Sequence, residues 1–120
     1  MTVDELIEKI TTEPASIDFT EVINTIEKSY HYTPTRFHNG NGSKAVTNAA
    51  GSNEGSCKIF AFGKLNKLKE QQTLACFGYY YREDVLGHPE GDDHANIRNF
   101  MLYGWKGIKF EGEALTLMDS

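Results

Sequence analysis

The sequence predicts a helix-rich α+β fold, with four or five helices and a small two-stranded β-ribbon. Three observations support this. Apolar residues recur at helical spacing in several stretches, start and stop signals bound those stretches, and apolar residues alternate near the C-terminus. Splitting 120 residues into two cores would leave both too small to offset the loss of chain entropy. We therefore expect residues 1–120 to form a single domain.

Capping boxes mark the first two helices. In each box a polar residue accepts from the third helical amide, and an acidic side chain reaches back to the amide of the cap. Pro14 separates the two helices, because it lacks an amide hydrogen. The boxes are Thr2 with Glu5, for a helix over residues 3–11, and Asp18 with Glu21, for a helix over residues 18–30.

A strand and a long loop follow. Residues 32–38 are rich in β-branched and aromatic side chains, and Pro34 suits an edge strand. Residues 38–56 are dominated by Asn, Gly and Ser, including two consecutive Asn-Gly pairs. A loop of this length is uncommon in a compact domain, and it is usually functional or mobile. Both alternatives stay open.

Three further helices are predicted: one from Cys57 onward, one over about residues 70–86 and one over about residues 93–103. The first is apolar nearly all round and should be central. Gly78 lies inside the second, which favours close approach of another helix there. The last should be capped by Asp92 or Asp93, bury Ile97, Phe100 and Met101, and end at Gly104. Ile108 and Phe110 then alternate in residues 105–115, which predicts a strand paired with the one around Phe37.

Charge and composition exclude several classes of function. The net charge is -5, with seven acids against two lysines in residues 1–28 and a balanced remainder. Phosphate backbones need clustered Lys and Arg, so we expect no nucleic-acid partner. The apolar runs are too short for a signal peptide or a spanning helix, so we expect no membrane partner. Cys57 and Cys76 both lie among apolar residues, which fits buried thiols in a reducing compartment.

Four long strings resemble the HopJ type III effector family of bacterial proteins, over about residues 32–115. They are YTPTRFHNG, NEGSCKIFAF, TLACFGYYYREDVL and GDDHANIRNFMLYGWKGIKFEGEAL. The resemblance implies a bacterial protein that is either delivered by a type III secretion system or resident in the bacterial cytoplasm. It implies no assigned biochemical activity, no cofactor and no catalytic residue.

Cys57 is the candidate nucleophile of an alternative function. Gly55-Ser56-Cys57 opens a predicted helix, and a thiol in a first turn has its pKa lowered by the helix dipole. His94 could act as its base, oriented by a neighbouring Asp or Asn. This hypothesis describes a small cysteine-dependent hydrolase or transferase. The alternative is a buried structural thiol.

A second candidate site is a metal site formed by His88, Asp92, Asp93 and His94, whose side chains suit a mixed oxygen and nitrogen shell. The spacing within this group does not present two ligands from one element. Asp92 and Asp93 fit helix capping better, so no metal is predicted.

The leading hypothesis is a binding surface for an unidentified protein or small molecule. Exposed tyrosines beside arginine, with a tryptophan, are residue types enriched at interaction hot spots. The alternative is that each tyrosine buries its ring and keeps its hydroxyl in water. A hydrogen-bonded network could also join the long loop to the last helix, through Asn48, Asn53, Glu54, Asn96, Arg98 and Asn99. The candidate binding residues are Asn53, Glu54, Tyr79, Tyr80, Arg82, Asp84, Arg98 and Trp105.

Overall fold

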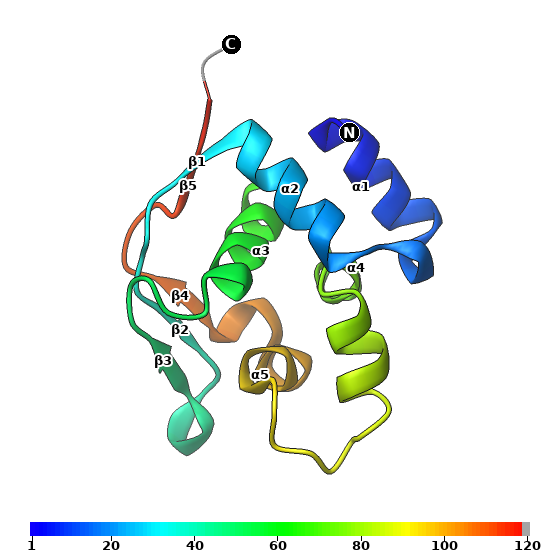
Figure 1. Ribbon diagram of the computed structural model, residues 1–120. Coiled ribbons are helices and arrows are strands. Elements are labelled where there is room, and N and C mark those ends of the chain that lie inside the picture. Colours follow the sequence, from blue (N-terminus) through cyan, green and yellow to red (C-terminus); the bar gives the residue numbers. More distant parts are fainter. Residues whose placement is uncertain (119–120) are drawn as a thin grey trace.

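A computed structural model describes residues 1–118 and confirms a helix-rich α+β fold (Figure 1). The helices are α1 (Val3–Thr12), α2 (Phe19–Ser29), α3 (Glu54–Leu65), α4 (Glu70–Ala75) and α5 (Ala95–Tyr103). A π-helical segment spans Tyr80–Val85, and short 3-10 turns span Pro14–Ser16, Gly42–Lys44 and Gly104–Gly107. The strands are β1 (Tyr30–Tyr32), β2 (Phe37–Asn39), β3 (Val46–Asn48), β4 (Ile108–Phe110) and β5 (Leu115–Leu117).

Helix α3 occupies the centre of the molecule, as its sequence predicts. It lies between the α1–α2 pair and the strands, with α5 beyond its lower end (Figure 1). Four consecutive residues, Ile59 to Phe62, are all buried, so this helix has partners on nearly every side. The Phe60 ring lies 5.0 Å from that of Phe100 and 5.4 Å from that of Phe77. Aromatic contacts at this spacing join α3 to segments distant in sequence.

The two predicted capping boxes set the starts of α1 and α2. In α1 the Glu5 amide donates to Thr2 Oγ1 at 3.1 Å, and the Thr2 amide donates to Glu5 Oε1 at 2.8 Å. In α2 the Asp18 amide donates to Glu21 Oε2 at 2.8 Å. These local bonds explain why both helices begin where the sequence predicts.

The β-structure is larger than the predicted two-stranded ribbon. Strands β2 and β4 pair antiparallel, as predicted, with Phe37 opposite Phe110. Strand β3, inside the predicted loop, adds to the other side of β2. Strands β1 and β5 form a second, separate ladder. The predicted single strand over residues 32–38 is therefore divided, because Pro34 has no amide hydrogen to continue the pairing.

The predicted helix over residues 70–86 is interrupted at Gly78, and that prediction is wrong in its continuity. Gly78 has a φ of +58°, which ends α4 before the π-helical segment begins. A Cβ atom at Gly78 would lie 2.8 Å from the Phe19 amide nitrogen. The predicted close approach is therefore present, and the partner is the chain that enters α2.

The last helix begins two residues later than predicted and is not capped by aspartate. His94 occupies the cap position with a φ of 52°, and no side chain caps the helix. Asp93 instead pairs with Arg98 at 2.7 Å. Gly104 ends the helix as predicted, whereas Met101 is 43% exposed and does not belong to the buried face.

Candidate functional site

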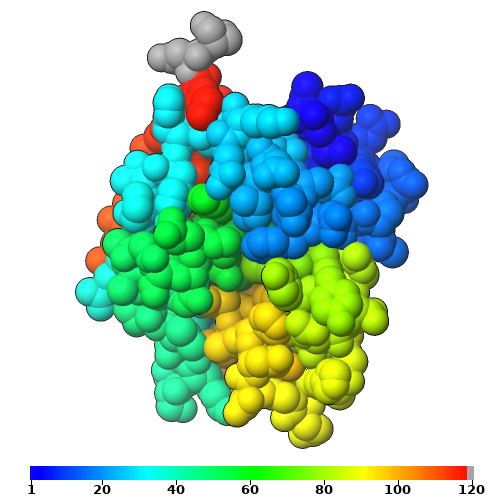
Figure 2. Space-filling model, viewed as in Figure 1, coloured from blue at the N-terminus to red at the C-terminus, as the bar shows by residue number. Residues whose placement is uncertain are grey.

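A pocket of ≈ 370 Å³ lies where the starts of α3 and α5 meet the π-helical segment. Segments around residues 20, 55, 80 and 95 converge on the face shown in Figure 2. The pocket thus combines parts of the chain that are far apart in sequence. Its lining residues are Phe19, Val46, Asn53, Gly55, Ser56, Phe77, Tyr80, His94, Ala95, Asn96 and Ile97.

Both helices that open on the pocket start in the same unusual way. Asn53 and His94 have left-handed backbones, with φ of 50° and 52°. Their carbonyls accept from Cys57 and Arg98, while neither side chain caps its helix. The amides in the first turn of a helix have no acceptor inside that helix. First-turn residues of both helices line this pocket, so its wall contains hydrogen-bond donors.

A buried asparagine cluster holds the long loop against α5. Asn96 Oδ1 accepts from Asn39 Nδ2 and from Asn48 Nδ2, both at 3.0 Å. Asn96 Nδ2 donates to Asn48 Oδ1 at 2.9 Å, and Asn53 Nδ2 donates to the same oxygen at 2.6 Å. Asn99 adds bonds to the carbonyls of Asn39 and Lys44. The predicted network is confirmed for Asn48, Asn53, Asn96 and Asn99, whereas Glu54 and Arg98 are not among its partners. The cluster positions the starts of α3 and α5 relative to each other.

The rings of Phe19, Tyr80 and His94 form an aromatic wall of the pocket, in addition to the polar wall at the two helix starts. Tyr80 is 40% exposed, and its ring centroid lies 5.1 Å from that of Phe19 and 5.3 Å from that of His94. His94 Nε2 lies 3.0 Å from Asp84 Oδ2, which orients the imidazole. Within residues 1–118, His94 Nδ1 and the Tyr80 hydroxyl have no hydrogen-bond partner in the protein. The pocket therefore offers flat apolar surface beside polar groups.

Of the predicted binding residues, Asn53 and Tyr80 line this pocket, and Asp84 supports it through His94. Glu54 begins α3 without lining it, and Tyr79, 60% exposed, points elsewhere. The three consecutive tyrosines thus point in different directions: Tyr80 lines the pocket, Tyr79 faces solvent, and Tyr81 packs against the core.

The remaining three predicted binding residues have other contacts. Arg82 Nη1 donates to the Ile17 carbonyl at 2.9 Å. Arg98 bonds the His88 carbonyl and Asp93, holding the segment before α5. Trp105 Nε1 donates to the Leu68 carbonyl at 3.0 Å, and its ring lines a separate cavity of ≈ 230 Å³. None of these three residues lines the pocket between the starts of α3 and α5.

Phe19, Ser56 and Val46 also line the pocket, although they are not among the residues that the sequence predicts for a site. Phe19 belongs to the predicted apolar stripe of α2, and Val46 to a strand within the predicted loop. The signal that could have found Ser56 is its position beside Asn53 and Cys57 at a helix start.

Cys57 is a buried thiol in unreactive surroundings. Its side chain is 1% exposed, and Sγ donates to the Thr35 carbonyl at 3.7 Å. Burial raises the thiol pKa, and the Glu54 carboxylate adds to that rise. The expected lowering by the helix dipole is therefore wrong, because desolvation outweighs it. Cys57 does not line the pocket that contains His94, so the hydrolase or transferase hypothesis gains no support from this arrangement.

We expect iodoacetamide to label native Cys57 at pH 8 at least about 100-fold more slowly than it labels the unfolded chain. Burial limits access, and the raised pKa lowers the thiolate fraction, so the rate should climb as pH approaches that pKa. Mass spectrometry of the labelled peptides measures this. Cys76 is the internal reference, since burial raises its pKa to about 12. Fast labelling of native Cys57 at neutral pH would restore the enzyme hypothesis.

Asp93 and His94, two of the candidate metal ligands, pair with Arg98 and Asp84. The hydrogen bond from Arg98 lowers the Asp93 pKa. Among residues 1–118, no three His, Cys, Asp or Glu side chains lie close enough together to hold a metal ion. Over the same residues, no helix is long and apolar enough to span a bilayer.

The fold and pocket define a small helix-rich α+β domain with a polar-aromatic pocket between two helix starts. The family model described as HopJ type III effector protein matches residues 3–115, and the chain belongs to this family. It is also similar to a protein of unknown function, VPA0580, whose crystal structure superposes with a TM-score of 0.93. The two sequences are 51% identical, over 98% of this chain and 95% of the other. No curated protein matches the chain.

Proposed function

We propose that this HopJ protein acts by binding a planar group that carries acceptor oxygens, in the pocket between the starts of α3 and α5. The observation that carries the proposal is Tyr80, which lines this pocket and is 40% exposed, with its ring in edge-to-face contact with Phe19 and in tilted contact with His94. An aromatic ring held on both sides offers a rigid surface at little entropic cost.

The polar wall indicates which ligand chemistry fits. First-turn amides of two helices are donors, and helix starts favour negative charge. Ser56 and His94 add side-chain groups at the same wall. A carboxylate or carbonyl attached to a ring satisfies both walls at once. Small aromatic acids carry such a group, and a C-terminal aromatic residue of a protein partner offers a ring and a carboxylate close together.

Three probes separate the contributions of ring and charge: benzoate has both, benzamide keeps the ring, and inorganic phosphate keeps the charge. We expect isothermal titration calorimetry to rank benzoate as the tightest, because only benzoate combines a ring for the aromatic wall with a negative charge at the helix starts.

Tyr80→Ala should weaken benzoate binding about fivefold or more, since it removes the exposed ring. Tyr79→Ala is the matched control: it deletes a neighbouring tyrosine that is 60% exposed and outside the pocket. Its dissociation constant should stay within about twofold of the unmodified protein. Equal losses in the two variants, or no binding of any probe, would remove the proposal.

We further propose delivery through a type III secretion system, supported by the description of the family. Helix α1 begins at Val3 and buries Leu6 and Ile10, so the first residues must unfold from the core during export. A reporter fused to residues 1–28 should leave the cell only when the secretion system is intact. Retention of the reporter both in cells with an intact secretion system and in cells that lack it would exclude this route.

A further inference from the structure

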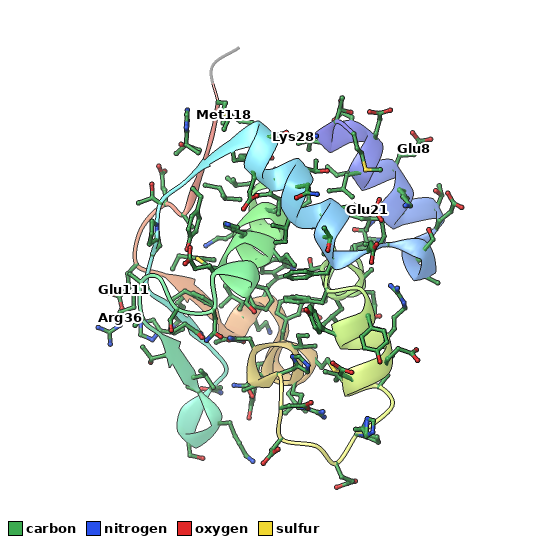
Figure 3. The ribbon with its side chains drawn as sticks, in the orientation of Figure 1. Glu8, Glu21, Lys28, Arg36, Glu111 and Met118 are labelled. Atoms are coloured by element: carbon green, nitrogen blue, oxygen red, sulfur yellow. The ribbon has the colours of Figure 1, made fainter. Side chains whose placement is uncertain are left out.

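An apolar groove of ≈ 930 Å³ lies between the end of α3 and strand β5. Its volume is within the range of pockets that hold small-molecule ligands. Leu65 and Leu117 line the groove, and they are 54% and 70% exposed. Leu117 directly precedes Met118, which Figure 3 labels where the chain leaves β5. The groove therefore offers apolar surface that the described part of the chain leaves in contact with water.

A smaller cavity continues from this groove along one face of β4. Phe110 lines the groove, and Ile108 lines the cavity of ≈ 230 Å³. Alternate residues of a strand face the same side, so both pockets lie on one face of β4. Lys64 lines both pockets, and its Nζ lies 5.9 Å from the centre of the Phe110 ring. The Lys64 side chain therefore marks the point where the two pockets meet.

The smaller cavity carries positive charge, although the protein has a net charge of -5. Its lining includes Lys64, near the end of α3, and Lys67, just beyond that end, and it includes no acid. Both lysines are exposed, and within residues 1–118 neither takes part in an ion pair. By contrast, Lys9 and Lys58 each pair with a glutamate. Two free ammonium groups beside an apolar groove indicate a ligand with an anionic head and an apolar tail.

We propose that the joined pockets bind one long-chain fatty acid, with its alkyl tail in the groove and its carboxylate between Lys64 and Lys67. The tail removes the exposed Leu65 and Leu117 side chains from water, which is favourable in proportion to the apolar area covered. Lysine stems lie along apolar surface while their ammonium groups reach the charged head. This site is separate from the pocket at the helix starts, because Lys64 lies at the opposite end of α3 from Asn53.

The charges around the two pockets favour a head with a single negative charge. Asp4 and Glu113 line the groove, so the joined pockets present two acids as well as two lysines. A carboxylate carries one negative charge, whereas a phosphate monoester carries about 1.5 to 2 at pH 7. The two acids repel the additional charge, so a carboxylate fits better. Tighter binding of dodecyl phosphate than of dodecanoate would overturn this choice of head.

Isothermal titration calorimetry of the full chain with dodecanoate, kept below the concentration at which it forms micelles, tests the proposal. We expect saturable binding of one dodecanoate per chain. In the series octanoate, decanoate and dodecanoate, each extension should tighten binding about tenfold, because it buries two more methylene groups. Dodecyltrimethylammonium has the same tail with a positive head, and it should bind at least about tenfold more weakly. No saturable binding of dodecanoate, or equal affinities for the two heads, would overturn the proposal.

Matched variants test the head and the tail separately. Lys64→Gln should weaken dodecanoate binding about fivefold, because it removes one of the two charges at the carboxylate. Its control is Lys44→Gln, since Lys44 is also exposed but lies in the turn between β2 and β3 and lines neither pocket. Leu117→Asn should cause a similar loss, whereas Leu102→Asn, at a 71% exposed position on α5, should stay within about twofold. Equal losses within either pair would contradict the proposed pose.

A ¹⁵N-HSQC titration with dodecanoate locates the bound chain. We expect the amides of Leu65, Lys67 and Leu117 to shift, because these residues line the joined pockets. The amides of Gly55 and Ser56 at the start of α3 should stay in place, since they line the other pocket. Shifts confined to Gly55 and Ser56 would overturn the fatty-acid site. Benzoate binding is measured at those two amides, so each proposal can fail without the other.

Discussion

Asn96→Ala should lower the free energy of unfolding by about 3 kcal/mol, because it leaves buried polar groups of the asparagine cluster without partners. Asn48 is 2% exposed and loses both its acceptor and its donor on Asn96. Asn39, which is fully buried, loses one of its two acceptors. Urea denaturation followed by circular dichroism measures the change.

Asn24→Ala is the control for this substitution. Asn24 is exposed on α2 and belongs to no such cluster, so its replacement should change stability by less than about 0.5 kcal/mol. Hydrogen exchange adds a local readout: amides of residues 40–53 should exchange faster in Asn96→Ala, because the cluster holds this loop. Equal stability of the two variants would show that the cluster does not hold the loop.

Gly78→Ala should cost about 3 kcal/mol, from a left-handed backbone that alanine disfavours and from a steric clash. The new Cβ atom would lie 2.8 Å from the Phe19 amide nitrogen and 3.2 Å from the Ile17 carbonyl oxygen. Both contacts are with backbone, so neither can relieve the clash by changing rotamer. Because Phe19 lines the pocket, benzoate binding should weaken as well.

Gly42→Ala separates the two contributions. Gly42 has the same φ of +58°, but a Cβ atom there meets nothing within 4 Å. Its replacement should therefore cost only about 1 kcal/mol, from backbone conformation alone. If the two alanine variants have equal melting temperatures, the close approach at Gly78 contributes nothing to stability.

The helix starts that depend on neighbouring residues could be predicted from the sequence. Thr2 with Glu5 and Asp18 with Glu21 form bonds within one turn, and their sequence spacing alone specifies them. The central position of α3 also follows from its composition, since apolar residues on all sides require partners on all sides.

Features that depend on distant contacts could not be predicted in this way. Gly78 is compatible with a continuous helix until the chain around Phe19 packs against it. The Cys57 pKa depends on burial against strands and loops, which the local helix dipole does not reveal. The pocket likewise needs Phe19 and Tyr80, which are far apart in sequence, to come into edge-to-face contact.

Ion pairs at the periphery contribute less to stability. Figure 3 shows Arg36 and Glu111 together at the outer end of the strands, where their side chains approach to 3.4 Å. Both are largely exposed, and an exposed pair contributes little to stability. The buried cluster and the aromatic wall should therefore dominate both folding and binding.

The most direct test of the binding proposal is a ¹⁵N-HSQC titration of the full chain with benzoate. We expect progressive shifts centred on the amides of Gly55, Ser56, Ala95 and Asn96, which line the pocket at the two helix starts. Shifts confined to Leu115 and Leu117, which line a separate groove beside the end of α3, would contradict the binding proposal. The absence of a saturable shift at the helix starts would contradict it as well.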